Sequence, residues 1–258
     1  MSQKPLKNYV VSNLFRLGSS KWAWTDRADE GDIYEQYHRM YRISLASFKH
    51  FLAGDWEPIL WTGEVEHSCK IAEANWPLQY DLWHKEPCNI LYHGPDTLMI
   101  KPTEIFDKFT GFELFNYTDP KALTIDNPYG WDVPHYLNDD LRYMPHSMDP
   151  KLWETGAEWA KNWNTDNNEL GWNYGQVLHN IMYWNQNRTL EETLRPQLFW
   201  QAFMLPGTVQ HIMFLNQWNN CDIINAHVLH CAGSRGAKAK ADMMYSIARD
   251  LGIPLDGV

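Results

Sequence analysis

The sequence predicts an α/β protein, a three-layer α/β/α sandwich with a central, mostly parallel (mixed) sheet. Two observations predict this fold. Short apolar segments that contain β-branched residues alternate with segments of helical periodicity through the first 106 residues. The 258 residues suffice for a sizeable core, and no repeat, low-complexity tract or flexible linker interrupts them. We therefore expect a single domain over residues 1–258.

The first part of the chain is expected to run strand, helix, strand, helix, strand. The predicted strands cover residues 7–13, 57–63 and 89–93, and the predicted helices cover 33–52 and 66–76. In the first helix apolar residues recur every three or four positions, and Asp32 is a plausible cap. Ligands of parallel sheets collect beyond the carboxyl ends of the strands. Asp96 follows the third strand and is expected at such an end.

The second part carries more irregular structure. Strands are predicted at residues 112–117 and 221–230, and helices at 176–184 and 238–251. A further helix should begin at Asp149-Pro150, where Asp can cap it and Pro fits the first turn. The intervening residues 118–148 are rich in Pro, Asp, Asn, Tyr and His, and are predicted to form a long loop.

Composition excludes several classes of protein. The net charge is −10 and no long basic run exists, so generic binding to a nucleic-acid backbone is disfavoured. No apolar stretch is long enough to span a bilayer, and the first residues lack the apolar core of a signal peptide. The four cysteines show no C-x-x-C spacing, which suits a reducing compartment. We expect a soluble, cytoplasmic protein.

The segment NILYHGPDTLMIKPTEIF (89–106) places one carboxylate, Asp96, in a turn between two apolar stretches. A carboxylate at a strand end can hold a divalent cation, and such a cation can bind a diphosphate as a Lewis acid. Gly94 would let a ligand approach the backbone closely. The structural alternative is an ordinary turn with a solvent-exposed Asp.

The segment HVLHCAGSRGAKAK (227–240) runs from a predicted strand through two glycines into a helix. The amide groups and positive dipole end of a helix start favour anions. His230 is a candidate metal ligand, because neutral imidazole binds such ions. For Lys240 we expect a solvated helix face.

The segment 89–106 resembles the part of nucleotide-diphospho-sugar transferases of the GT-A fold that reads strand, Asp-x-Asp, apolar strand, Lys/Arg-Pro, acidic residue, Phe. HCAGSRGAK (230–238) is similar to the His-x-x-Gly…Lys loop of the glycogenin and lipopolysaccharide galactosyltransferase type. WNYGQVLHNIMYWNQ (172–186) resembles the acceptor-side segment of the same enzymes. The matches occur in the family's order, between about residues 8 and 250.

The resemblance implies a transfer of sugar from a nucleotide-diphosphate donor, most simply a UDP-sugar, to a saccharide or another hydroxyl acceptor. It implies that Asp96 and His230 hold Mn²⁺ or Mg²⁺, and that Gly233, Arg235 and Lys238 contact the diphosphate. Gln176 would lie near the transferred sugar as the catalytic polar group. Residues 1–106 would form the nucleotide-sugar-binding half, and residues 107–258 the acceptor-side half with its closing helix.

Two departures from the family pattern leave alternatives open. Gly94 stands where the first Asp of Asp-x-Asp is usual, and Gly175 stands where an Asp usually precedes Gln176. The alternative function is therefore a catalytically inactive nucleotide- or sugar-binding protein on the same fold. A nucleic-acid acceptor is disfavoured by the acidic balance, yet stays open. The acceptor's base is also open, with candidates among Asp119, Asp126, Asp139 and Asp140.

Overall fold

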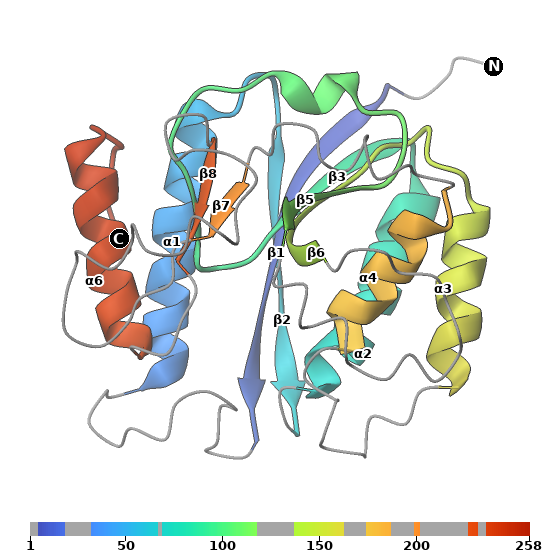
Figure 1. Ribbon diagram of the computed structural model, residues 1–258. Coiled ribbons are helices and arrows are strands. Elements are labelled where there is room, and N and C mark those ends of the chain that lie inside the picture. Colours follow the sequence, from blue (N-terminus) through green and yellow to red (C-terminus); the bar gives the residue numbers. More distant parts are fainter. Residues whose placement is uncertain are drawn as a thin grey trace.

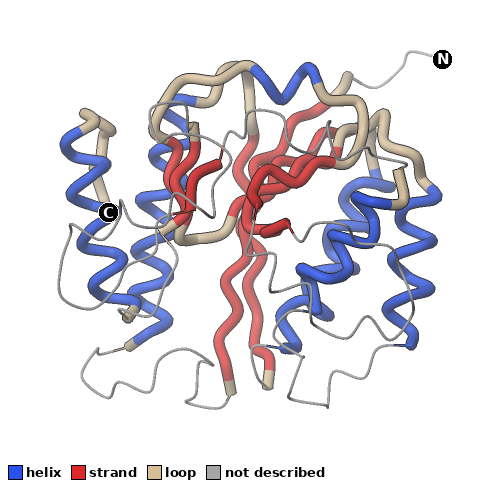
Figure 2. Tube along the Cα trace, viewed as in Figure 1, coloured by secondary structure: helices blue, strands red, loops and turns tan. Residues whose placement is uncertain are grey.

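The computed structural model of the protein describes residues 5–18, 32–66, 69–117, 137–162, 174–186, 199–201, 227–231 and 236–258. Figure 1 shows a sheet between two groups of helices, and Figure 2 shows the same layers coloured by element. Helices α1 (Ile33–Phe51) and α6 (Ala237–Asp250) lie on one side. Helices α2 (Cys69–Lys85), α3 (Lys151–Asn162) and α4 (Tyr174–Trp184) lie on the other. The predicted three-layer α/β/α arrangement is confirmed.

The main sheet has the strand order β2-β1-β3-β6-β5. Its strands are β1 (Lys7–Leu17), β2 (Glu57–Val65), β3 (Cys88–His93), β5 (Glu113–Tyr117) and β6 (Leu137–Met144). Strand β1 pairs in parallel with β2 and β3, whereas β6 is antiparallel to both β3 and β5. Among the described strands the sheet is therefore mixed rather than mostly parallel.

A second, smaller sheet has the order β4-β8-β7. It consists of β4 (Thr97–Met99), β7 (Phe199–Gln201) and β8 (Val228–His230). Strand β4 runs antiparallel to β8, with Thr97 opposite His230. This pairing brings the turn after β3 beside the end of β8, although the two segments are far apart in the sequence.

The predicted helices form largely where the periodicity placed them. Asp32 caps α1 as expected, because its carboxylate accepts a hydrogen bond from the Tyr34 amide at 3.0 Å. Helix α2 runs further than predicted, to Lys85. Of the strand expected at residues 221–230, β8 covers the last three residues, and residues 221–226 lie outside the described part. A 3₁₀ helix, η1 (Ile105–Lys108), precedes β5.

The predicted loop at residues 118–148 is wrong over its last part, because residues 137–144 form β6 in the main sheet. Apolar periodicity is weak in this strand, which reads Leu-Asn-Asp-Asp-Leu-Arg-Tyr-Met. Arg142 is charged but only 2% exposed. Hydrogen bonds to Gln79 and to the Asp139 carbonyl stabilise its buried guanidinium. Charged side chains that are buried with bonding partners interrupt the alternation of apolar and polar residues, so sequence patterns do not predict this strand.

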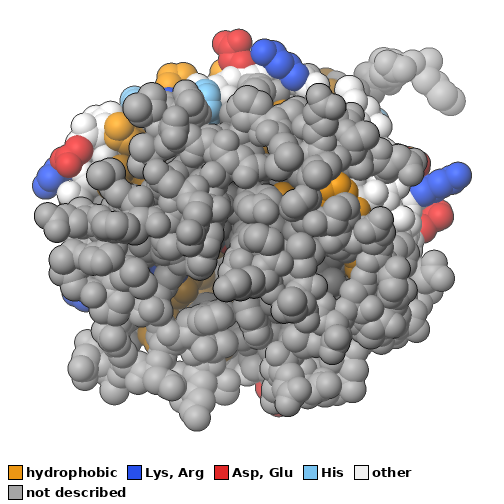
Figure 3. Space-filling model, in the orientation of Figure 1, with side chains coloured by type: hydrophobic (Ala, Val, Ile, Leu, Met, Phe, Trp, Pro, Cys, Tyr) orange, Lys and Arg blue, Asp and Glu red, His pale blue; other side chains and the backbone are white. Residues whose placement is uncertain are grey.

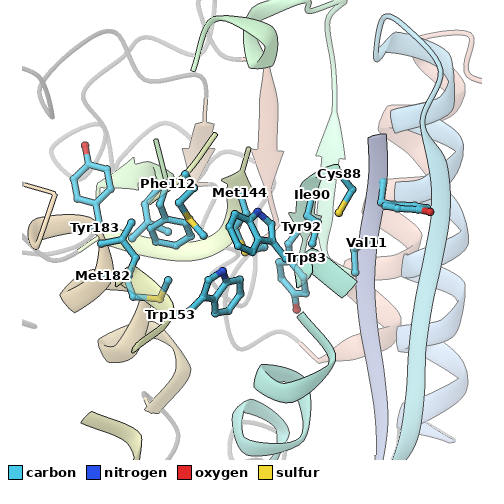
Figure 4. Close-up of a cluster of buried hydrophobic side chains, with 14 of the residues drawn as sticks. Val11, Trp83, Cys88, Ile90, Tyr92, Phe112, Met144, Trp153, Met182 and Tyr183 are labelled. Carbon is cyan, nitrogen blue, oxygen red and sulfur yellow. The ribbon is translucent and has the colours of Figure 1, made fainter. Parts of the chain in front are cut away.

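The core on the α2, α3 and α4 side is dominated by large aromatic rings, which Figure 4 shows as Trp83, Tyr92, Phe112, Trp153 and Tyr183. The Nε1–H of Trp83 donates to the Pro145 carbonyl at 3.1 Å, so its polar edge is satisfied. A second cluster packs α1 against α6 and includes Met40, Ile43 and Met244. None of the described helices is long and apolar enough to cross a membrane.

Candidate functional site

The site is built on the turn between β3 and β4. The Gly94 carbonyl accepts hydrogen bonds from the Thr97 amide at 3.2 Å and the Thr97 hydroxyl at 2.8 Å. The Asp96 carbonyl accepts a bond from the Cys231 amide at 2.8 Å. The turn is thus fixed to the main sheet at one end and to the end of β8 at the other, and Asp96 is held between the two sheets.

Three potential metal ligands converge here. The Nε2 atom of His230 lies 3.4 Å from Asp96 Oδ1 and 3.2 Å from Asp140 Oδ2. One ligand atom from each of Asp96, Asp140 and His230 lies within 4.8 Å of the others. His230 is 5% exposed and Asp96 is 9% exposed, whereas the Asp140 side chain is 32% exposed, so Asp140 forms the solvent-facing rim of the cluster. The structure brings Asp96 and His230 together, as the sequence hypothesis requires, and adds Asp140 from β6.

Gly94 and Asp140 are in close contact. The Gly94 amide donates to the Asp140 carbonyl at 2.7 Å. A Cβ atom on Gly94 would lie 2.9 Å from Asp140 Oδ1 and 3.2 Å from Asp140 Cβ. The Asp140 side chain therefore occupies the space beside Gly94, and a larger residue at position 94 would displace it. The turn has no carboxylate at position 94, and Asp140 of β6 places one beside that position.

Lys240 also reaches the cluster. Its Nζ donates to Asp96 Oδ2 at 2.8 Å, and the residue is only 7% exposed. The expectation that Lys240 lies on a solvated helix face is wrong. Helix α6 packs against α1 through its small and apolar residues, Ala237, Ala241 and Met244, and Lys240 is buried with that face.

The charges of the cluster shift one another's pKa. Burial alone would raise the pKa of Asp96, but Lys240 and His230 lie beside it and hold that pKa well below its usual range. Burial opposes protonation of His230, yet the carboxylates of Asp140 and Asp96 outweigh it and raise the pKa of the imidazole. Asp96 likewise raises the pKa of Lys240 against the effect of its burial. Asp96 is therefore ionised and Lys240 charged at neutral pH.

Of the residues expected at the diphosphate, Lys238 is described and the others are not. Lys238 is 58% exposed, and its ammonium bonds to Asp242, one turn along α6, at 2.6 Å. Gly233 and Arg235 lie outside the described residues. Gln176 belongs to the first turns of α4, but its side chain is outside the described part as well. The roles assigned to these four residues stay predictions.

His93 ends β3 directly beside the site but belongs to the core. Its ring stacks on Phe48 at a centroid distance of 4.4 Å and lies parallel to the Tyr41 ring at 6.3 Å. Its Nδ1 lies 2.9 Å from the Ser44 hydroxyl. Burial lowers the pKa of His93 to about 4, so the ring is neutral at physiological pH.

Asp139, the neighbour of Asp140, takes part in a different network. Its carboxylate lies 2.7 Å from His179 Nδ1 and 3.6 Å from Arg142 Nη1. The Arg142 guanidinium lies over the Tyr92 ring at 3.4 Å. Of the four candidate bases, Asp139 is thus tied to α4, Asp140 joins the metal cluster, and Asp119 and Asp126 lie outside the described residues.

Sequence reasoning missed Asp140 as a ligand and Lys240 as its neighbour. The Asp139-Asp140 pair was visible, but the surrounding segment was expected to be loop, and strand pairing alone sets Asp140 beside Gly94. For Lys240 the alanines at positions 237, 239 and 241 were the available signal, because small residues permit close packing of a helix.

In Figure 3 the described charged side chains of opposite sign lie next to each other at the edges of the visible face. The described Lys and Arg side chains seen there form no patch of one sign.

No protein-family model matches the chain, and no curated protein matches it. Similar solved structures include the galactosyltransferase LgtC in complex with donor and acceptor sugar analogues, with 11% identity and a TM-score of 0.47 over 92% of this chain and 95% of that one. An active-site mutant of LgtC has 11% identity and a TM-score of 0.45 over 93% and 95%. The apo form of mouse xyloside xylosyltransferase 1 has 9% identity and a TM-score of 0.42 over 88% and 98%.

Proposed function

We propose that the protein is a divalent-metal-dependent glycosyltransferase that moves a sugar from a nucleotide-diphosphate donor, UDP-sugar foremost, to a hydroxyl acceptor. The observation that carries the proposal is the convergence of Asp96, Asp140 and His230 at the turn of the segment 89–106. That segment is also the part of the sequence that resembles nucleotide-sugar transferases. Metal-ligand chemistry and sequence resemblance thus coincide at one place in the fold.

The donor set suits the proposed cation. Two carboxylates and one imidazole, with ligand atoms within 4.8 Å of one another, fit Mn²⁺, and carboxylates also suit Mg²⁺. When bound, such a cation neutralises the diphosphate as a Lewis acid. Asp96 would bind the cation from the turn between β3 and β4, Asp140 would bind it from β6, and His230 would bind it from β8.

In the transfer, the bond from the anomeric carbon to the diphosphate oxygen breaks with its electron pair, and a bond to the acceptor oxygen forms. The acceptor's proton leaves to a base or to the departing diphosphate. Arg235 and Lys238, near the start of α6, are proposed to neutralise the leaving group. Gln176 of α4 is proposed to hold the sugar.

The alternative of an inactive binding protein drew on the missing carboxylates at Gly94 and Gly175. Asp140 fills the space beside Gly94 and offers a carboxylate to the same cluster. Because Asp140 supplies a carboxylate beside Gly94, we favour a functional metal site over one that has lost a ligand.

The direct test is isothermal titration of the protein with UDP, with and without Mn²⁺. We expect binding that Mn²⁺ strengthens, and we expect Asp140→Asn and Asp96→Asn to lose the Mn²⁺ effect. The exposed Asp81→Asn on α2 serves as the control. Absence of binding to every nucleoside diphosphate, with and without metal, would falsify the proposal.

Turnover separates the two functions. Release of UDP from UDP-hexoses, with water or with saccharide acceptors, is expected for a transferase. A bound UDP-sugar that is never cleaved under any of these conditions would favour the inactive binding protein.

A further inference from the structure

Lys240 is a buried cation at the proposed metal site. It approaches from α6, whereas the three potential ligands come from the β3–β4 turn, β6 and β8. Its Nζ donates to Asp96 Oδ2 at 2.8 Å, and the lysine is 7% exposed. The other buried residues of α6 are alanine and methionine, so Lys240 is a buried charge whose ionic partner is Asp96.

We infer that Lys240 is a built-in counter-cation that weakens the binding of a divalent metal at Asp96, by its charge and by holding one of the two carboxylate oxygens, and makes metal binding depend on an anionic ligand. The inference rests on the proposed function in taking Asp96, Asp140 and His230 as the metal ligands. It goes beyond that function by assigning to Lys240 the control of the metal's affinity and of its dependence on a bound diphosphate.

The geometry gives the first reason. Asp96 has two carboxylate oxygens, of which Oδ2 faces Lys240 and Oδ1 faces His230. A cation among Asp96, Asp140 and His230 therefore meets Oδ1, while the ammonium retains Oδ2. Metal coordination by both oxygens of Asp96 would require Lys240 to move away.

Charge gives the second reason. The two carboxylates carry two negative charges, the ammonium carries one positive charge, and a metal-binding imidazole is neutral. The cluster then has a net charge of about −1 by this count, and a divalent cation would reverse it to about +1 beside the buried Asp96. A diphosphate restores the balance. Metal and diphosphate should therefore strengthen each other's binding, and the coupling is reciprocal.

The experiment is titration of the full chain with Mn²⁺ alone, with free Mn²⁺ followed by electron paramagnetic resonance. Wild type is compared with Lys240→Met, Lys240→Gln and the control Arg249→Gln, an exposed cation on the same helix. We expect the Lys240 variants to bind Mn²⁺ at least tenfold more tightly than wild type, and the control to match wild type. Lys240 variants that keep the wild-type circular dichroism and bind Mn²⁺ no more tightly overturn the inference.

A second measurement uses wild type and does not depend on whether the variants fold. Mn²⁺ affinity is measured with and without saturating UDP, after the association of Mn²⁺ with UDP in buffer has been measured separately. We expect UDP to raise the affinity at least tenfold in wild type and by a smaller factor in Lys240→Gln. Equal affinity with and without UDP in a wild type that binds both overturns the inference.

The two proposals can fail separately. If no form binds UDP, the transferase proposal fails, and the Mn²⁺ comparison between wild type and the Lys240 variants still decides the role of Lys240. If UDP and Mn²⁺ bind and the Lys240 variants equal wild type, only the Lys240 inference fails. If no form binds Mn²⁺, both fail.

Discussion

At the residue scale, the tightest packing in the candidate site is between Gly94 and Asp140. The close approach explains why position 94 carries no side chain: an added Cβ would meet the Asp140 carboxylate at 2.9 Å. Real Cβ atoms do not tolerate such a distance from a fixed neighbour, so either the turn or Asp140 would shift. Because Asp140 lies near the rim of the cluster, we expect Asp140 to be the group that moves.

Gly94→Ala should therefore weaken both Mn²⁺ binding and the fold. We expect at least a tenfold loss of Mn²⁺ affinity, and a loss of unfolding free energy of about 1–3 kcal/mol typical of overpacking. The measurements are Mn²⁺ titration and urea unfolding. Gly18→Ala is the control, because an added Cβ there would lie no closer than 3.6 Å to its nearest atom. Unchanged Mn²⁺ affinity in Gly94→Ala would mean that Asp140 is not a ligand.

His93 should make stability depend on pH in a defined window. The folded pKa of about 4 lies below the value of 6.5 for a free histidine. Between these values the unfolded chain binds a proton that the folded chain does not, so stability falls as pH drops from about 6.5 to about 4. The full loss is roughly 3 kcal/mol, from 1.36 kcal/mol for each unit of pKa difference.

The measurement is urea unfolding across that pH range in wild type and in His93→Asn, which keeps a polar atom near Ser44. The variant should lose less stability on acidification than wild type, whereas His84→Asn, at an exposed histidine of α2, should follow wild type. Parallel pH profiles for wild type and His93→Asn would show that His93 does not titrate as a buried neutral ring.

Also at the residue scale, the sequence predicted Asp96 and His230 as residues of the site but did not predict Lys240. Asp96 and His230 belong to segments whose residues resemble a known family. Lys240 lies among alanines and other lysines, and its local signal is weak: it shares a helix face with Ala237, Ala241 and Met244, whereas Lys238 does not. The difference between 9% and 58% side-chain exposure arises from the rotation of α6 against α1, which is a property of helix packing.

At the scale of elements, local patterns predicted most helices and the parallel strands, and they failed at β6. Strands β1 and β3 are apolar because both of their faces are covered. Strand β6 carries Asp139, Asp140 and Arg142, each of which bonds to or pairs with a group from another part of the chain. A strand whose polar side chains bond to distant segments shows no apolar–polar alternation in its own sequence.

Helix α3 offers a test of element packing. A Cβ on Gly156 would lie 2.6 Å from Trp76 Cη2 and 2.8 Å from Trp76 Cζ2 of α2. Trp76 in turn packs edge-on against Trp153, with ring centroids 4.8 Å apart. Gly156→Ala should push α3 from α2 and lower the unfolding free energy by about 1–3 kcal/mol, despite the better helix propensity of alanine.

Urea unfolding measures this loss, and Thr155→Ala is the adjacent control, expected within about 0.5 kcal/mol of wild type. Because Gly156 belongs to α3 and the cluster residues belong to the β3–β4 turn, β6 and β8, Mn²⁺ affinity of the folded Gly156→Ala variant should equal that of wild type. A stability gain in Gly156→Ala would show that the indole ring can move aside at no cost.

At the scale of the whole molecule, the candidate cluster links the two sheets. Asp140 belongs to the main sheet, His230 to the small sheet, and Asp96 to the turn between them. A ligand that binds only the folded chain stabilises it by mass action, by about 2.7 kcal/mol at a concentration one hundred times the dissociation constant. Mn²⁺ bound at this junction should thus stabilise the entire fold.

We expect Mn²⁺ to raise the melting temperature of wild type, and EDTA to reverse the rise. Asp140→Asn should lose the rise, whereas Asp139→Asn should melt at a lower temperature and keep it, because Asp139 bonds to His179 outside the cluster. Differential scanning calorimetry gives both quantities. An equal Mn²⁺-induced rise in wild type and in Asp140→Asn would place the bound ion elsewhere.

The sequence by itself determined the α/β class, the helix and strand segments with strong periodicity, and two residues of the candidate site. These features depend on local spacing and on residues close in the chain, which a sequence displays directly. Tertiary structure alone decided that β6 lies antiparallel beside β3, that Asp140 occupies the space left by Gly94, and that Lys240 turns inward to Asp96. Each of these depends on contacts between distant segments, whose free energy comes from burial and pairing in three dimensions and leaves no periodic trace in either segment.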